Sequence, residues 1–205
     1  MLIPLPYLIE KYKLEINRVL HVGASTGQEA EAYHKAGVSH VTWIEADPVT
    51  FEGLKLHLFK FPGQYAINAC ISDVDGHEVP FYRTNNEGQS SSILQLGTHK
   101  KVHPQVHVTE VINVITSRID TLLPDADFDF LNMDLQGAEL LALRGMGEML
   151  RKFKYLYLEV NWQELYKGCG MYRDIDKYIE SFGFKIIESK QSGKTGWGDA
   201  FAVKR

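Results

Sequence analysis

The sequence of 205 residues has little cysteine, no surplus of basic residues and no long hydrophobic run. Its two cysteines, Cys70 and Cys169, lie far apart and form no CxxC pair, which predicts buried thiols in a reducing compartment such as the cytoplasm and leaves a disulfide as the alternative. The net charge of -4 argues against a nucleic-acid or anionic-membrane binder, because such proteins need a basic face. The apolar N-terminus is broken by Pro4 and Pro6 and soon becomes charged, so we expect neither a signal segment nor a membrane span.

No repeat, low-complexity tract or linker interrupts the chain, and 44% of its residues are hydrophobic, which suits one domain, residues 1–205, with a substantial core. Apolar runs alternate with helical segments, and this order predicts an α/β fold with a mostly parallel sheet and an antiparallel last strand. Strands are expected at residues 19–22, 40–44, 65–71, 106–116, 127–134, 155–160, 184–189 and 200–204. Helices are expected in the lead-in segment 1–18, at about 7–17, and at residues 27–37, 48–61, 138–144 and 171–182.

Three segments between the expected strands have their own signals. Asp75-Gly76 predicts a hairpin in which residues 78–82 pair back on the strand before the turn. Residues 84–105 form a polar loop insertion that is long enough to cover an acceptor site. Residues 197–199 are expected to form a turn at the rim, where Trp197 would lie over a sugar face, although a packed aromatic is an equal alternative.

A glycine loop follows the first strand. Val19 to Val22 end at Gly23, a small-residue turn continues through Ser25 and Thr26, and Gly27 opens a helix. The backbone N–H groups of such a loop point at a ligand above the strand, or the loop is only a tight strand-to-helix connection. The spacing lacks both the GxGxxG of dinucleotide sites and the Lys-Ser or Lys-Thr of a P-loop, so a nucleoside with less phosphate fits better.

Carboxylates end three of the expected strands. Glu45 ends the second strand, about twenty residues after the loop, where an acid accepts hydrogen bonds from ribose hydroxyls. Asp134 ends a buried strand and directly precedes a helix, and Glu159 ends the next strand. Because ligands of open α/β sheets lie above these strand ends, we expect Asp134 and Glu159 at the catalytic centre. Asp134 as a helix cap is the rival interpretation, and Glu139 is expected only to favour the helix N-terminus.

Three histidines, His99, His103 and His107, recur every four residues and would share one face of a helix. Pro104 interrupts that helix, so we favour a solvated, mobile loop and expect no metal there. A metal held by Asp134 and Glu159 remains the minority alternative.

With these motifs in place, the chain resembles S-adenosylmethionine-dependent methyltransferases of the FkbM type. The DxQGxE motif with its LRG tail is the most specific part of the resemblance. The matching pieces are Val22-Gly23-Ala24-Ser25-Thr26-Gly27, Ile44-Glu45-Ala46-Asp47-Pro48, Ser72-Asp73-Val74-Asp75-Gly76, Ser90-Ser91-Ser92, Asp134-Leu135-Gln136-Gly137-Ala138-Glu139 with Leu143-Arg144-Gly145, and Gly196-Trp197-Gly198-Asp199-Ala200.

The resemblance implies a doubly wound, Rossmann-like sheet of about seven strands, S-adenosyl-L-methionine as cofactor and O-methylation, often of sugar or polyketide hydroxyls. It places the cofactor at His21, Gly23, Ser25, Thr26, Gly27, Glu45, Ala46, Ser72, Asp73 and Asp134. One position departs from the family, because His21 stands where an acid usually helps to anchor the methionine end of the cofactor.

The resulting hypothesis is an O-methyltransferase that acts on a hydroxyl of a sugar, glycan or related small molecule. Asp134 would orient or deprotonate the acceptor. The main alternative is a non-catalytic nucleotide-binding module in glycan assembly, which His21 favours. A nicotinamide-dependent oxidoreductase is a second alternative, and the missing middle glycine counts against it. The acceptor and the oligomeric state stay open.

Overall fold

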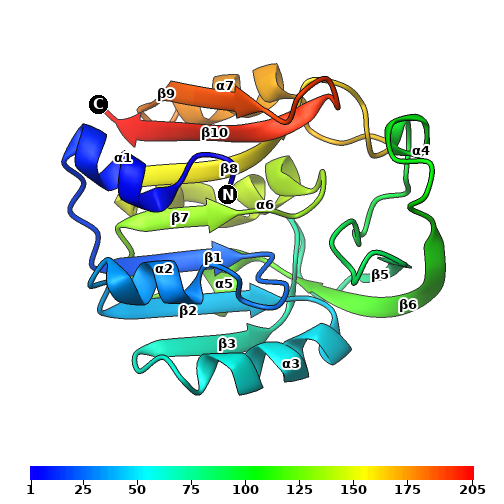
Figure 1. Ribbon diagram of the computed structural model, residues 1–205, viewed down its shortest axis with the longest axis horizontal. Helices are drawn as coiled ribbons and strands as arrows, with labels where there is room; N and C mark the ends of the chain where they lie inside the picture. Colours follow the sequence, from blue (N-terminus) through cyan, green and yellow to red (C-terminus); the bar gives the residue numbers. More distant parts are fainter.

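A seven-stranded sheet forms the centre of the structure, a computed structural model that describes residues 1–205 (Figure 1). Across the sheet the strands are β3 (Gln64–Asn68), β2 (His40–Glu45), β1 (Arg18–Val22), β7 (Phe130–Met133), β8 (Tyr155–Asn161), β10 (Trp197–Lys204) and β9 (Phe184–Gln191). β10 runs antiparallel to both of its neighbours, and the other pairs are parallel. The predicted Rossmann-like sheet with an antiparallel last strand is therefore confirmed.

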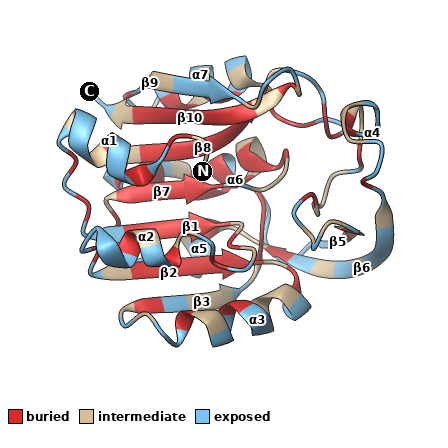
Figure 2. Cartoon of the chain, viewed as in Figure 1, coloured by how far each residue is buried: buried red, intermediate tan, exposed pale blue.

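Helices cover both faces of this sheet. Their bounds are α1 (Leu5–Tyr12), α2 (Ala30–Lys35), α3 (Pro48–Leu58), α4 (His99–Val102), α5 (Ile119–Leu122), α6 (Glu139–Met146), the 3₁₀ helix η1 (Gly147–Lys152) and α7 (Tyr172–Glu180). Leu20 and Val22 of β1 pack in one core with α5, α6, η1 and α7, whereas Val19 packs in a second core with α1, α2 and α3. Successive residues of a strand point to opposite faces, so β1 supplies both cores and is almost entirely buried (Figure 2). None of the helices is long and apolar enough to cross a membrane.

A second, three-stranded sheet corrects the predicted hairpin. Its order is β4 (Cys70–Ile71), β6 (Val108–Ser117) and β5 (Glu78–Thr84). The Asp75-Gly76 turn exists, but β5 pairs antiparallel with β6, and β6 pairs parallel with β4. The two-residue β4 offers little to pair with, and the ten-residue β6 lies between the two predicted partners.

The predicted strand 65–71 is also divided. It ends in the large sheet at Asn68, and the backbone N–H of Ala69 donates to the carbonyl of Glu45. The chain then enters the small sheet at β4. Other boundaries differ as well. The first helix begins and ends earlier than predicted, β7 is shorter than the predicted strand 127–134, and residues 197–199 begin β10 instead of forming a turn.

Candidate active site

A cavity of about 790 Å³ lies above the carboxyl ends of β1, β2, β7 and β8. Parts of the polar insertion, residues 84–105, form one of its walls. Its lining is strongly acidic: six carboxylates line it, and no lysine or arginine does. They are Glu29, Glu45, Asp47, Asp134, Glu159 and Asp199. Such a cavity favours a cationic ligand over a phosphorylated one, because phosphate sites use basic side chains or helix N-termini.

The glycine loop reaches the cavity through its first half. Gly23 and Ser25 line the cavity, whereas Thr26 and Gly27 do not. A Cβ on Gly23 would lie 1.7 Å from the carbonyl oxygen of Asp134, and its φ is +85°, so only glycine lets the loop touch the end of β7. A Cβ on Gly27 would instead meet Leu54 of α3 at 2.9 Å, which assigns that glycine to helix packing.

Glu45 holds together the loops that follow β1 and β2. Its Oε2 accepts the backbone N–H of Ser25 at 2.8 Å, and its Oε1 accepts that of Asp47, also at 2.8 Å. Burial raises the pKa of this carboxyl to about 7, and the two backbone donors only partly offset that effect. Ala46 also lines the cavity.

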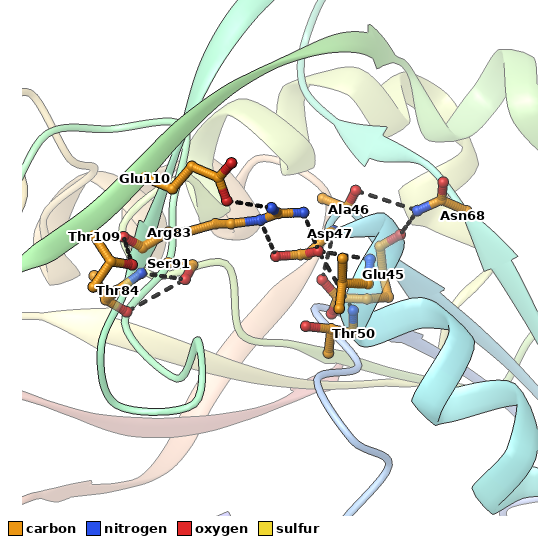
Figure 3. A network of polar contacts seen from close by, with 11 residues as sticks. Glu45, Ala46, Asp47, Thr50, Asn68, Arg83, Thr84, Ser91, Thr109 and Glu110 are labelled. Carbon is orange, nitrogen blue, oxygen red and sulfur yellow. Dashed lines mark hydrogen bonds and ion pairs between the residues drawn. The ribbon is translucent and has the colours of Figure 1, made fainter.

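Asp47 connects this corner to the small sheet (Figure 3). Its Oδ1 accepts the backbone N–H of Val49 at 2.8 Å and so caps α3. Arg83 of β5 donates to both oxygens of Asp47, at 2.7 Å and 2.8 Å, and to Glu110 of β6 at 2.6 Å. This bidentate ion pair fixes the small sheet against the end of β2.

Ser72 and Asp73 were expected at the cofactor but are not among the residues that line the cavity. They pack beneath α6, where a Cβ on Gly145 would lie 2.1 Å from the carbonyl oxygen of Ser72. The glycine of the LRG tail therefore allows α6 to approach this turn. The neighbouring residues Cys70 and Ile71 line the cavity instead.

The DxQGxE motif gathers acids around one glutamine. Gln136 adopts a left-handed backbone with φ of 53°, which is uncommon for a residue other than glycine. Its Nε2 donates to Asp134 Oδ1 at 2.6 Å and to Glu159 Oε2 at 3.0 Å, while the hydroxyl of Tyr166 donates to its Oε1 at 2.5 Å. The structure thus brings the two predicted catalytic carboxylates together.

Glu139 completes this group. Its Oε1 accepts the backbone N–H of Leu135 at 2.7 Å and that of Gly137 at 3.1 Å. Burial raises the pKa of Glu139 to about 7 and that of Glu159 well above its usual value, and the neighbouring carboxylates add to both shifts. Asp134 is open to the cavity, yet protein atoms crowd its carboxylate and raise its pKa to about 6.

His21 lies in the floor of the cavity and is almost completely buried. Its ring stacks on Trp43 with 4.3 Å between centroids, and its Nδ1 lies 3.1 Å from the hydroxyl of Tyr33 and 3.3 Å from the amide of Asn132. Burial lowers the pKa of His21 to about 4, so the ring is neutral at physiological pH. An uncharged, packed imidazole has a structural role here, and the acid that faces the cavity nearby is Glu29.

Several residues at this site received no role from the sequence, or a different one. Gln136 and Glu139 belong to a recognised motif, and their position just after β7 was the available signal. Tyr166 carries no local signal, because the fold alone brings it to the cavity. Asp199 belongs to a motif that carries the family resemblance, and the structure places it in the cavity lining. His99 of α4 lines the cavity as well, and burial lowers its pKa to about 4 and leaves its Nδ1 without a partner.

The model of the methyltransferase FkbM domain matches residues 21–186 of this chain, which is more than half of its length. The chain belongs to the FkbM methyltransferase family. The family match confirms the resemblance that the motifs predicted. This FkbM protein is a methyltransferase, and its cofactor is S-adenosylmethionine.

Individual relatives extend the comparison. The chain is 28% identical over 174 residues to the 2-O-methyltransferase NoeI of Sinorhizobium fredii, and the match covers 80% of this chain and 71% of that protein. Magnesium protoporphyrin IX methyltransferase (ChlM) from Synechocystis PCC 6803, with bound SAM, has a TM-score of 0.58 at 12% identity, over 98% of this chain and 76% of that one. Ribosomal protein L11 methylase from Lactobacillus delbrueckii subsp. bulgaricus has a TM-score of 0.55 at 12% identity, over 96% and 75%. The two solved structures show a shared fold.

Proposed function

We propose that this FkbM protein methylates a hydroxyl of a sugar, glycan or related small molecule. The observation that supports an acceptor of this kind is that Asp134 and the polar wall of residues 84–105 line the same cavity. Ser92 donates to the carbonyl of Leu135 at 3.5 Å, and Tyr166 lies between Ser90 and Gln136, so the wall contacts the motif that carries Asp134. The name of NoeI, a 2-O-methyltransferase, supports a hydroxyl acceptor.

The residues of the cavity fit a cationic nucleoside cofactor. The carboxylate of Glu45 would accept the ribose hydroxyls, and the backbone at Gly23 and Ser25 would approach the cofactor closely. Glu29 would take over the role of the acid that His21 replaces and hold the amino end of the cofactor. When bound, the cofactor supplies an electrophilic methyl group on a positively charged sulfur.

Asp134 would act on the acceptor. One of its oxygens is held by Gln136, and the other is free to accept the hydroxyl proton as the oxygen becomes a nucleophile. Its raised pKa makes it a stronger base than an ordinary aspartate, and at neutral pH it is still mostly ionised. Glu159, on the other side of Gln136, would fix the orientation of that glutamine and so of Asp134.

Polar groups of the insertion suit a carbohydrate. The wall presents asparagine, glutamine and serine side chains, among them Asn86, Gln89 and Ser91, which both donate and accept hydrogen bonds. Trp197 at the start of β10 adds an aromatic surface on the same cavity. The two thiols Cys70 and Cys169 are buried and free, which agrees with the expected cytoplasmic location.

The alternative of a non-catalytic binding module loses its main support. His21 is neutral and packed against Trp43. Although it stands in place of an acid, the cavity is still lined by six carboxylates. An oxidoreductase that uses a dinucleotide is disfavoured by a lining with no lysine or arginine for the pyrophosphate.

Transfer of labelled methyl tests the proposal. The protein is incubated with methyl-labelled S-adenosylmethionine and carbohydrates that have one free hydroxyl, next to matched deoxy or already methylated sugars. We expect label in the hydroxyl-bearing acceptors only, in a product that survives alkali, because ethers resist the hydrolysis that cleaves methyl esters. Label that is released by alkali, or no label with a wide panel of hydroxyl acceptors, would contradict a hydroxyl acceptor.

A further inference from the structure

Three carboxylates from separate elements converge next to the cavity. Asp134 follows β7, Glu139 begins α6, and Glu159 lies in β8. One oxygen from each lies within 4.8 Å of the oxygens from the other two. Only Asp134 and Glu159 were considered together from the sequence, and the fold adds Glu139 as a third.

Each carboxylate of this acidic triad has one oxygen held by a neighbouring donor. Gln136 donates to Asp134 Oδ1 and to Glu159 Oε2, and the backbone of Leu135 and Gly137 donates to Glu139 Oε1. The second oxygen of each has no hydrogen-bond donor. This pattern is the usual support of metal-ligating carboxylates, in which outer hydrogen bonds orient a ligand while its other oxygen stays available.

A second observation also points to a bound cation. Glu139 has no exposed surface, and its Oε2 atom has no hydrogen-bond partner. No lysine or arginine forms an ion pair with any member of the triad. An unpaired buried carboxylate is costly, so such groups in folded proteins are normally paired with a cation or bound to a metal.

We propose that the acidic triad of Asp134, Glu139 and Glu159 binds a hard divalent cation, of the class of Mg²⁺, Mn²⁺ and Ca²⁺. A donor set made only of carboxylate oxygens selects these ions over the softer transition metals. Two oxygens on opposite sides of one ion lie about 4.2 Å apart for Mg²⁺ and up to about 5.2 Å apart for Ca²⁺. At the 4.8 Å limit the triad fits one Ca²⁺ as it stands, whereas Mg²⁺ needs the oxygens to approach to about 4.2 Å.

The position of this site gives the ion a role beside Asp134. A divalent cation there would neutralise the triad and take the free oxygen of Asp134 as a ligand. With the ion bound, the ion would take over from Asp134 the attraction of a hydroxyl oxygen that enters from the polar wall. The inference does not require methyl transfer, because the three side chains are in place without cofactor or acceptor. Metal binding and methylation can therefore fail separately.

Titration with Mn²⁺ tests the site directly. Protein treated with a chelator and then freed of it is titrated with Mn²⁺ alone, and free Mn²⁺ is measured by electron paramagnetic resonance. Mg²⁺ and Ca²⁺ are then added as competitors. We expect one bound Mn²⁺ per chain, which Mg²⁺ or Ca²⁺ displaces, in the absence of cofactor.

Three variants locate the ion. Glu139→Gln and Glu159→Gln keep the shape of the side chains and should each weaken Mn²⁺ binding by about tenfold or more. Glu29→Gln removes an acid from the same cavity but outside the triad and should leave the affinity within about twofold. Circular dichroism shows which variants fold, and Glu159→Gln serves if Glu139→Gln does not.

Three results would overturn the proposed metal site. Absence of Mn²⁺ binding at millimolar concentration would overturn the proposal and would mean that protons alone neutralise the triad. Binding that survives both triad variants, or that is lost only in Glu29→Gln, would place the ion elsewhere and also overturn it. Binding that appears only after S-adenosylhomocysteine is added contradicts a site formed by the three side chains themselves.

Discussion

Replacement of Glu45 by glutamine should weaken cofactor binding and remove its pH dependence. The carboxylate accepts one backbone N–H on each oxygen, from Ser25 and from Asp47. A glutamine amide accepts only one of these, because its NH₂ group would face the other donor. The uncharged amide also removes the charged acceptor that the ribose hydroxyls would use. A hydrogen bond to a charged group contributes about 1.5–3 kcal/mol, so its loss should raise the Kd for cofactor about ten- to a hundredfold.

The raised pKa of Glu45 sets the direction of the pH effect. If ribose hydroxyls bind only the ionised form, with a pKa of about 7, cofactor should bind the wild type about tenfold more weakly at pH 6 than at pH 8. Because the pKa of Glu45 is higher in the folded chain than in the unfolded chain, protonation of Glu45 stabilises the folded protein. Its contribution to the stability of the ligand-free protein is complete below the ordinary pKa of 4.5 and is lost as the pH rises through about 7. Asp47, the neighbouring acid, is paired with Arg83.

Calorimetric titration with S-adenosylhomocysteine at pH 6, 7 and 8 measures both effects. Glu52→Gln is the matched control, since Glu52 is an exposed acid of α3 that pairs only with Lys55. The control should behave as the wild type does. A Kd for Glu45→Gln within twofold of the wild type, or wild-type binding that does not change with pH, would refute the role given to Glu45.

Further changes test other parts of the site. Asp134→Asn should leave the Kd for cofactor within a few-fold and lower single-turnover methyl transfer by about a hundredfold or more, the usual effect of a lost general base; normal turnover would exclude Asp134. Gly23→Ala, which places a Cβ against the Asp134 carbonyl, should lower the Tm by at least about 4 °C. Gly37→Ala, at a similar φ of +77° with nothing within 4 Å, should lower it less, and equal losses would show backbone strain alone. Trp197→Ala should raise the acceptor KM while the Tm stays nearly constant, whereas a large fall in Tm would assign Trp197 to the core. Protease cleavage within residues 84–105 should slow when cofactor and acceptor are both present, and equal rates would argue against a cover over the acceptor.

The sequence predicted the large sheet because its strands are apolar runs separated by clear helix signals. Glycine at Gly23 and acids at Glu45 and Asp134 mark strand ends, and parallel strand ends meet at one edge of a sheet. The small sheet was not predictable in the same way. Nothing local to Asp75-Gly76 shows that β6, about thirty residues later, takes the place of the nearer partner.

The polar network of the site was harder to predict than its acids. The role of Gln136 depends on a left-handed backbone and on Tyr166, which lies thirty residues away. In the sequence, His21 stands where an acid was expected to anchor the cofactor. Only its packing against Trp43 and Tyr33 shows that its ring has a structural role. Such contacts between distant segments follow from the tertiary fold and leave no periodic signal in the chain.

The most direct test of the account is a crystal structure of this chain with S-adenosylhomocysteine. We expect the ligand in the acidic cavity, with its ribose hydroxyls on the carboxylate of Glu45 and its sulfur on the side of Asp134. A ligand that leaves Glu45 without contact, or that lies away from Asp134, would contradict the central claim that this cavity is the site of methyl transfer.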